Sequence, residues 1–127
     1  MSKRYVLDSS AILAAIGYEP GHERVEPILA DSAVSMVNAA EVLTKLVERG
    51  ILIADALDDF SQLGVDLIPF DLDHAITVSE LRPHTRHLGL SLGDRACLAL
   101  AMQENAIAVT ADKSWATLNI CPVELIR

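Results

Sequence analysis

The sequence predicts a single α/β domain in which a parallel central sheet of about five strands is flanked by helices on both faces. Two observations predict this fold. Short apolar runs, typical of buried strands, alternate with longer segments whose apolar residues recur every three or four positions, as on one face of a helix. The 127-residue chain also contains no linker, repeat or low-complexity segment, so residues 1–127 are expected to form one domain.

The first strand is expected at residues 5–7, where the run YVL is apolar. A helix over residues 9–16 follows, because its apolar residues fall on one stripe. Pro20 and Gly21 mark a turn, and residues 22–30 predict a second helix.

Residues 33–37 predict the second strand. Asn38 is a favourable N-cap for a helix that runs to Arg49, and Gly50 ends this helix. Residues 51–63 predict a fourth helix, whose first turn is more apolar than one buried face requires.

A third strand over residues 65–70 contains Pro69, which has no N–H to donate to a neighbouring strand. We therefore expect either that this strand lies at an edge of the sheet or that Pro69 marks the end of the strand. Residues 71–81 predict a helix, and residues 82–89 lack a helical pattern and are expected to be irregular.

Residues 91–105 predict the most apolar helix, which is nearly continuous from Ala96 to Met102 and is therefore expected to be the central one. The fourth strand, a short helix and the last strand are expected at residues 106–110, 113–118 and 123–126.

Four acidic residues stand where a strand-like run passes into a helix-like one, namely Asp8, Glu41, Asp94 and Asp112. The strand ends of an open α/β sheet share one edge, and ligands bind in the crevice there. Carboxylates gathered at one point repel one another unless a cation lies among them. Hard divalent cations such as Mg²⁺ take oxygen ligands, so the placement predicts a metal site and indicates phosphate chemistry.

Each of these acids also fits a purely structural role. Asp8 and Asp112 stand where helix N-caps are common, and Asp94 follows Ser91 at capping-box spacing. Capping and metal binding are compatible, because a helix N-terminus favours negative charge.

Glu41 has two structural explanations of its own. It follows Asn38 at capping-box spacing and precedes Lys45 at the spacing of a helical ion pair. Asp71 and Asp73 also follow a strand and are the main rivals of the four acids, but they are expected to form the cap and first turn of their own helix.

The net charge of −8 argues against a nucleic-acid partner, which usually needs a basic surface. Bound cations would neutralise part of this charge. The basic residues are also unevenly spread, because the stretch RPHTRHLGLSLGDR has no acid before Asp94 and contains Arg82, His84, Arg86, His87 and Arg95. This stretch is either a solvated loop and helix end or a strip that contacts phosphates.

No apolar run approaches the ~18 residues of a membrane span, so no membrane partner is expected. The start of the chain lacks the apolar core of a signal peptide. Cys97 and Cys121 match neither a zinc motif nor a redox pair, and both are expected to be small buried hydrophobes. Together these features predict a cytoplasmic protein.

The segments VLDSSAILA, VNAAEVL, LSLGDRACLALA and VTADKSW resemble the motifs of PIN domains, and more closely those of VapC-type toxins of bacterial toxin–antitoxin pairs. The resemblance spans almost the whole chain. It implies a Mg²⁺- or Mn²⁺-dependent endoribonuclease that a cognate antitoxin inhibits, acting on RNA as a homodimer or a toxin–antitoxin hetero-oligomer. Two residues depart from the family pattern: Ala111 replaces a frequent Asn, and Trp115 a common Phe. We expect Trp115 to pack in the core and not to stack on a base.

By motif position, the resemblance implies that the catalytic and metal-binding acids are Asp8, Glu41, Asp94 and Asp112. Asp8 and Asp94 are the expected direct ligands, and the other two would ligate directly or through water. The residues expected to orient waters or contact phosphate are Ser9, Ser10, Thr110 and Arg95, the last with a surface ion pair as its alternative.

Other classes of protein fit parts of the pattern. A phosphoacceptor receiver would need a second acid where Ser9 stands, and a phosphohydrolase with an aspartyl nucleophile would need one at Ser10. A metal-free ribonuclease would need paired histidines, whereas His22, His74, His84 and His87 show no evident pairing and are expected on the surface. A non-catalytic PIN-like module that binds RNA or protein is the main alternative.

The apolar surplus of the chain, 51% hydrophobic residues, predicts an interface. The candidate surface for an antitoxin comprises residues 11–16, residues 25–29 and the ILI segment at 51–53.

Overall fold

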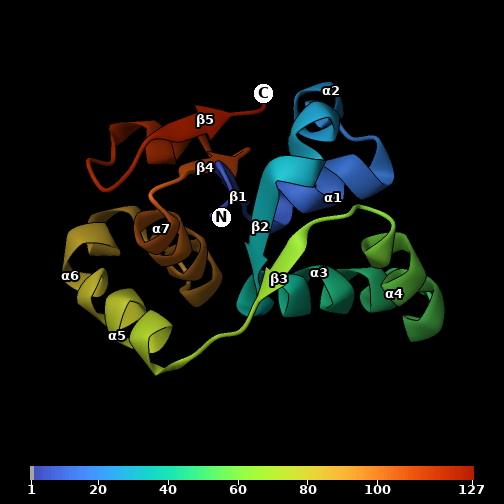
Figure 1. Ribbon diagram of the computed structural model, residues 1–127, viewed down its shortest axis with the longest axis horizontal. Coiled ribbons are helices and arrows are strands. Elements are labelled where there is room, and N and C mark those ends of the chain that lie inside the picture. Colours follow the sequence, from blue (N-terminus) through green and yellow to red (C-terminus); the bar gives the residue numbers. More distant parts are fainter. Residues whose placement is uncertain (1) are drawn as a thin grey trace.

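The computed structural model describes residues 2–127 and shows a five-stranded sheet between two groups of helices (Figure 1). The strands are β1 (Tyr5–Leu7), β2 (Ser32–Ser35), β3 (Asp66–Ile68), β4 (Ile107–Thr110) and β5 (Val123–Leu125). Their order is β3-β2-β1-β4-β5, and every neighbouring pair is parallel. The prediction of a parallel α/β domain is confirmed.

The strand order reverses at β1, which pairs with β2 on one side and with β4 on the other. The chain builds one half of the sheet outward from β1 to β3 and then crosses over to build the other half from β4 to β5. In sheets of this kind the ligand crevice lies beyond the carboxyl ends of the strands at this reversal point. The residues that follow β1 and β4 therefore occupy the favoured position for a site.

The helices form two groups, one on each side of the sheet. The group on the right of Figure 1 includes α1 (Ser9–Gly17), α2 (His22–Val25) and α4 (Ile53–Ser61), and α3 (Met36–Glu48) packs into the same core. The group on the left is α5 (Leu72–Glu80), α6 (Arg82–Thr85) and α7 (Leu92–Glu104). Three short 3-10 helices cover Glu26–Asp31, Arg86–Leu88 and Lys113–Thr117.

Helix α7 is the central helix of its layer, as its apolar sequence predicts. Every residue from Ala96 to Ala101 is buried, and the helix contacts β1, β2, β4, α3 and α5. A separate hydrophobic core lies on each face of the sheet, and β1 contributes to both. Val6 packs into the core on the α7 side and Leu7 into the core on the α1 side.

Two local predictions are wrong. Residues 82–89 were expected to be irregular but form α6 and the 3-10 helix Arg86–Leu88, which Gly89 ends with a left-handed backbone. Helix α3 begins at Met36 and not after Asn38, because the Ser35 hydroxyl already caps the Val37 N–H. Asn38 therefore lies inside the helix.

Other elements agree with the sequence apart from their ends. β3 is an edge strand and ends at Ile68, immediately before Pro69, so both alternatives expected from this proline are present. The expected helix over residues 22–30 is divided into α2 and the 3-10 helix Glu26–Asp31, because Pro27 lacks the N–H that a continuous helix needs. Cys97 and Cys121 are free thiols, the first buried and the second half-buried.

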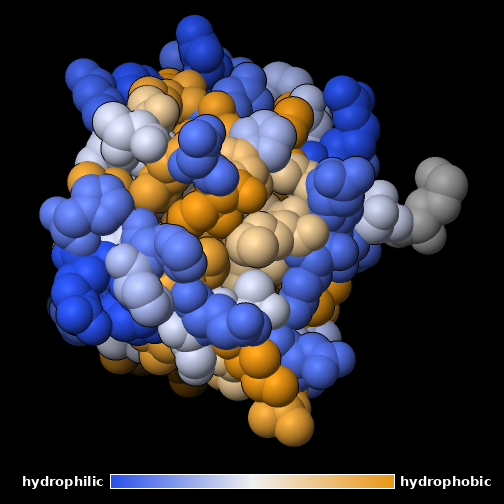
Figure 2. Space-filling view, turned by 90° about the vertical axis from the view of Figure 1, so that its left-hand side faces the viewer, coloured by the Kyte–Doolittle hydropathy of each residue, from blue (hydrophilic) through white to orange (hydrophobic). Residues whose placement is uncertain are grey.

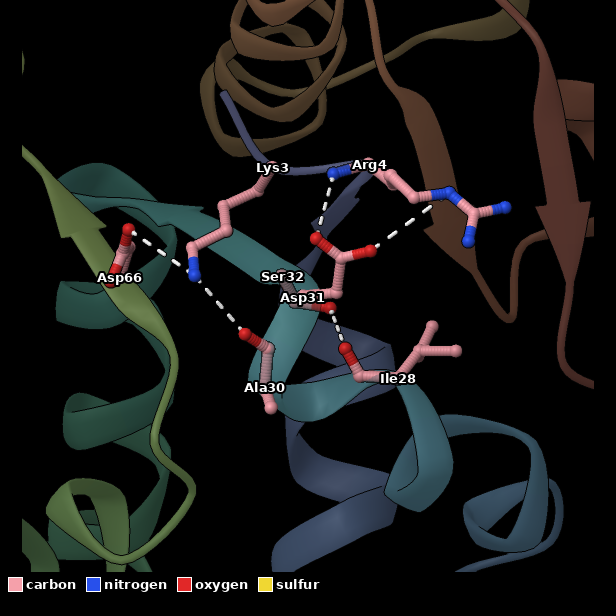
Figure 3. A network of polar contacts seen from close by, with 7 residues as sticks. All are labelled: Lys3, Arg4, Ile28, Ala30, Asp31, Ser32 and Asp66. Carbon is pink, nitrogen blue, oxygen red and sulfur yellow. Dashed lines mark hydrogen bonds and ion pairs between the residues drawn. The ribbon is translucent and has the colours of Figure 1, made fainter. Parts of the chain in front are cut away.

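A polar network joins the amino ends of three strands (Figure 3). Asp8 and Asp112 instead follow the carboxyl ends of β1 and β4. Lys3 Nζ donates to the Ala30 carbonyl oxygen at 3.1 Å and lies 3.8 Å from an Asp66 carboxylate oxygen. The Arg4 backbone N–H donates to Asp31 at 3.3 Å. These contacts tie β1 to the segments that begin β2 and β3.

The surface on the α5–α7 side has an apolar centre bordered by hydrophilic residues (Figure 2). Half-buried hydrophobic residues that pack on the core around α7 include Leu88, Leu118 and Cys121. Within residues 2–127, no helix is long and apolar enough to cross a membrane.

Candidate active site

Asp8 is the centre of the candidate site, and its carboxylate is 4% exposed. It follows β1 and is the N-cap of α1, so the capping role expected for it is present. Oδ1 accepts hydrogen bonds from the Ser10 hydroxyl at 2.7 Å and the Ala11 N–H at 2.9 Å. Oδ2 accepts one from the Thr110 hydroxyl at 2.5 Å. Three donors from the ends of β1 and β4 thus fix this carboxylate.

Burial raises the pKa of Asp8 from 3.8 to about 6, despite these hydrogen bonds. The negative charge of Asp94 contributes a smaller rise. A carboxylate with a raised pKa is one that lacks a compensating positive charge. Asp8 is therefore a group whose ionised form a cation would stabilise.

Asp112 joins Asp8 through Thr110, the last residue of β4. The Asp112 backbone N–H donates to the same Thr110 hydroxyl that donates to Asp8, at 3.0 Å. The Asp112 side chain is exposed and caps the following 3-10 helix by accepting from the Ser114 N–H and hydroxyl at 2.9 and 2.7 Å. The Ala111 N–H donates to the Ser10 hydroxyl, so residue 111 helps to position Ser10 through its backbone and not through its side chain.

Glu41 is held by its own helix α3 and by two neighbouring helices, α1 and α7. Its Oε1 accepts from the Ser9 hydroxyl at 2.5 Å and from Asn38 Nδ2 at 3.0 Å. The residue that packs on it is Gly93, since a Cβ added there would overlap the Glu41 carboxylate. Neither expected structural role is present: Glu41 caps no helix, and the described residues show no ion pair between Glu41 and Lys45.

Asn38 is a site residue that sequence reasoning missed by treating it as a helix cap. It is 1% exposed, and its Nδ2 also donates to the Gly93 carbonyl oxygen at 3.0 Å. Asn38 therefore links α3 to the first turn of α7. A signal was available, because Asn38 and Glu41 are three residues apart and share one face of a helix.

Asp94 lies in the first turn of α7 and forms the capping box that its spacing predicts. Its Oδ2 accepts from the Ser91 N–H at 2.9 Å, and its own N–H donates to the Ser91 hydroxyl at 3.2 Å. The side chain is half-buried. Asp94 is thus held at the start of α7, next to the glycine on which Glu41 packs.

Three of the carboxylates influence the pKa of the same buried thiol. Burial raises the pKa of the Cys97 thiol well above its usual value, and the charges of Asp8, Asp94 and Glu41 add to this rise. The fourth, Asp112, is connected through Thr110. The structure therefore brings together acids that follow β1 and β4 and acids of α3 and α7 at the carboxyl ends of the strands.

A divalent cation fits the donor set only as a largely hydrated ion. Among residues 2–127, no three His, Cys, Asp or Glu side chains stand close enough together to hold one ion between them. Mg²⁺ keeps several waters and commonly binds through one or two carboxylates. The buried Asp8, whose ionised form is disfavoured, suits such an ion, whereas a dehydrated cage of four carboxylates does not exist here.

An open groove of about 630 Å³ borders the site on the Glu41 side. It runs between α3, the segment before α5 and the start of α7, and Glu41 and Gly93 form part of its wall. Its remaining lining residues are Met36, Val37, Ala40, Thr44, Lys45, Phe70 and Leu92. Of the four acids, the groove therefore exposes Glu41.

Arg95 forms no ion pair among the described residues. Its Nη1 donates to the Val78 carbonyl oxygen of α5 at 3.2 Å, and its Nε is buried without a partner. Arg95 therefore ties α7 to α5, and the surface ion pair expected as its alternative role is absent.

One histidine contradicts the expectation of surface histidines. His74 is 1% exposed, because α5 turns it onto α7, where Nε2 lies 2.9 Å from the Ala96 carbonyl oxygen. Asp71 caps the His74 N–H at 2.8 Å, which confirms the structural role expected for that acid. Trp115 is fully buried, so it packs in the core as predicted.

The fold and the gathered carboxylates define a class of α/β protein with an acidic site at the carboxyl edge of a parallel sheet. The chain belongs to the PIN domain family, whose model matches residues 5–119.

Solved structures with the same fold cover nearly all of the chain. VapBC from Salmonella typhimurium, solved bound to DNA, has a TM-score of 0.78 at 17% identity and covers 100% of both chains. VapBC2 from Rickettsia felis, bound to a DNA fragment from its promoter, has a TM-score of 0.75 at 20% identity over 95% of this chain and 97% of its own. VapBC-5 from Mycobacterium tuberculosis has a TM-score of 0.64 at 25% identity over 98% of both chains. No curated protein sequence matches this chain.

Proposed function

We propose that this protein is a metal-dependent endoribonuclease, the toxin of a VapBC-type toxin–antitoxin pair. The proposal is supported by the contacts that link the four acids of this PIN domain. Ser9, next to Asp8, and Gly93, next to Asp94, both contact Glu41, and Thr110 joins Asp8 to Asp112. The solved VapBC assemblies with the same fold support the toxin assignment.

Mg²⁺ or Mn²⁺ would be held by Asp8 and Asp94 directly, and by Glu41 and Asp112 directly or through water. When bound, such a cation lowers the pKa of a coordinated water and neutralises charge on the phosphate. Direct ligation by all four acids would require side-chain movement, because no three of them stand together in the described residues.

The protein's own residues position the acids. Ser10 and Thr110 orient both oxygens of Asp8, so its ionised form faces a fixed direction. Ser9 and Asn38 do the same for Glu41. Fixed donors of this kind need no rearrangement when charge develops during the reaction. We propose that an RNA strand reaches these acids from the side of the groove that Glu41 borders.

The test is cleavage of total cellular RNA by the wild type and by Asp94→Asn, with Mg²⁺ or Mn²⁺ and with EDTA. Asparagine keeps an oxygen that can accept from the Ser91 N–H, so the variant should fold. We expect cutting that requires the cation and that Asp94→Asn reduces at least 100-fold, as about 3 kcal/mol of lost transition-state stabilisation would.

The matched control is Asp73→Asn, which removes an exposed acid in the first turn of α5. It should cut like the wild type. If folded wild-type protein bound RNA or a protein partner but left RNA intact with either cation, the chain would be the non-catalytic PIN-like module.

We further propose an antitoxin partner that binds on α4, in a homodimer or a hetero-oligomer. The structure corrects the candidate surface, because Ala11, Ile12, Leu13, Ala14 and Ala15 of α1 are buried in the core. Leu52 and Ile53, at the start of α4, are 72% and 53% exposed. Replacing both with Asp should leave the fold intact and weaken antitoxin binding more than tenfold, and unchanged affinity would exclude this surface.

A further inference from the structure

The segment from Arg82 to His87 is a basic strip on an otherwise acidic protein. It carries Arg82, His84, Arg86 and His87, all exposed, within a chain whose net charge is −8. Between Glu80 and Asp94 the sequence contains no acid. Among residues 2–127, no ion pair neutralises any of these four side chains.

The strip is rigid because buried residues anchor it on both sides. Leu81 and Leu90 are 5% and 2% exposed and pack in the α7 core. Between them, the fully buried Thr85 donates its hydroxyl to the Leu81 carbonyl oxygen at 2.9 Å. An exposed charge on an ordered backbone loses less entropy on binding than one on a loose loop.

The strip is joined to the start of α7, where Asp94 lies. Arg82 Nη1 reaches the Leu90 carbonyl oxygen at 3.5 Å, and Ser91 is the N-cap of α7. Leu88 directly follows the strip, and the three residues from Gly89 to Ser91 extend the chain by at most about 11 Å. Arg95, next to Asp94, also donates to Val78, four residues before Arg82. The positive charges therefore begin within a short distance of the proposed catalytic acids.

We infer that this strip binds the phosphates of the RNA strand that flank the cleaved bond, an inference that rests on the proposed ribonuclease function. Guanidinium groups match phosphate oxygens in a fixed fork geometry, and His rings can stack on unpaired bases. A polyanion would otherwise be repelled by a chain of charge −8. The strip explains how an acidic protein can hold RNA: repulsion is overcome locally, beside the site.

Salt dependence tests this inference separately from cleavage. The binding of a labelled single-stranded RNA is measured in the Asp94→Asn background, at fixed Mg²⁺ and increasing KCl. Each lost phosphate contact should make the slope of log K against log salt concentration shallower by about 0.7. We expect this change for Arg86→Gln, and we expect Arg86→Lys, which keeps the charge, to retain most of the slope.

The matched control is Arg24→Gln, which removes the same charge from an exposed position on α2, in the opposite helix group (Figure 1). Its slope should equal that of the parent. Equal slopes for Arg86→Gln and the parent, or equal changes for Arg86→Gln and Arg24→Gln, would overturn the inference.

Two further outcomes separate the possibilities. If Arg86→Gln weakened the binding of an acidic protein partner but left the RNA slope unchanged, the strip would be a protein interface and the inference would be wrong. If the slope depended on Arg86 while the wild type cut no RNA, the strip would stand and the proposed ribonuclease function would fail.

Discussion

Asp8 shows how a single buried carboxylate links stability to the site. Its pKa is raised to about 6, so the folded state binds a proton more tightly than the unfolded state, whose value is 3.8. Stability from this group is fully present below pH 4 and is lost as the pH rises through 6. The difference corresponds to about 3 kcal/mol.

We therefore expect Asp8→Asn to be more stable than the wild type at pH 7 in EDTA, by up to about 3 kcal/mol. The two proteins should differ little at pH 4, where Asp8 is largely protonated. Urea unfolding at both pH values measures this. The prediction fails if the wild type and Asp8→Asn differ in free energy of unfolding by the same amount at pH 4 and at pH 7. Ionisation of the buried Asp8 would then cost the folded state nothing.

Gly93 allows function to be separated from folding. Its missing Cβ leaves the space that the Glu41 carboxylate fills. Gly93→Ala should push this flexible side chain away from Ser9 and Asn38, while the helix gains up to about 1 kcal/mol from alanine's higher propensity. We expect a protein of equal or greater thermal stability whose RNA cleavage falls more than tenfold. Unchanged cleavage would remove Glu41 from the site.

The four acids could be predicted from their positions at strand ends, but their neighbours could not. Asn38 looks like a helix cap in sequence, and only the cap at Ser35 shows that it lies inside α3. His74 looks like a surface residue, since its burial depends on how α5 crosses α7. Which polar residue a helix turns inward is decided by tertiary packing.

At the scale of the element, the capping box of α7 holds Asp94 in place. Ser91→Ala removes the hydroxyl that accepts from the Asp94 N–H. We expect a loss of about 1 kcal/mol in the free energy of unfolding, typical of an N-cap substitution. Chemical denaturation measures it, and Ser91→Thr, which keeps an acceptor, should restore most of the loss. A loss as large for Ser91→Thr as for Ser91→Ala would contradict this explanation.

Helices with strong apolar periodicity were predicted well, and short elements were not. Helix α7 matches its predicted bounds within one residue at each end. Helix α6 has four residues and a proline, so no period can be read from it. It forms because Leu81 and Leu90 anchor the segment from both sides, and that depends on the rest of the fold.

At the scale of the whole molecule, cation binding should stabilise the fold, because the carboxylates come from elements that separate on unfolding. At 100 times its Kd, a bound Mg²⁺ adds about 2.7 kcal/mol. We expect the thermal midpoint of the wild type to rise with Mg²⁺ and that of Asp8→Asn to rise much less. Asp73→Asn should respond like the wild type. An equal response from Asp8→Asn would place the cation elsewhere.

The pairing of β4 beside β1 has a consequence for the moment at which the site first exists. Asp8 precedes Thr110, which completes its hydrogen bonds, and Asp112 by more than 100 residues. A chain still on the ribosome therefore lacks β4 and these two residues while that interval is being made. The four carboxylates can come together only after it, so a partner made at the same time can meet the chain before the site forms.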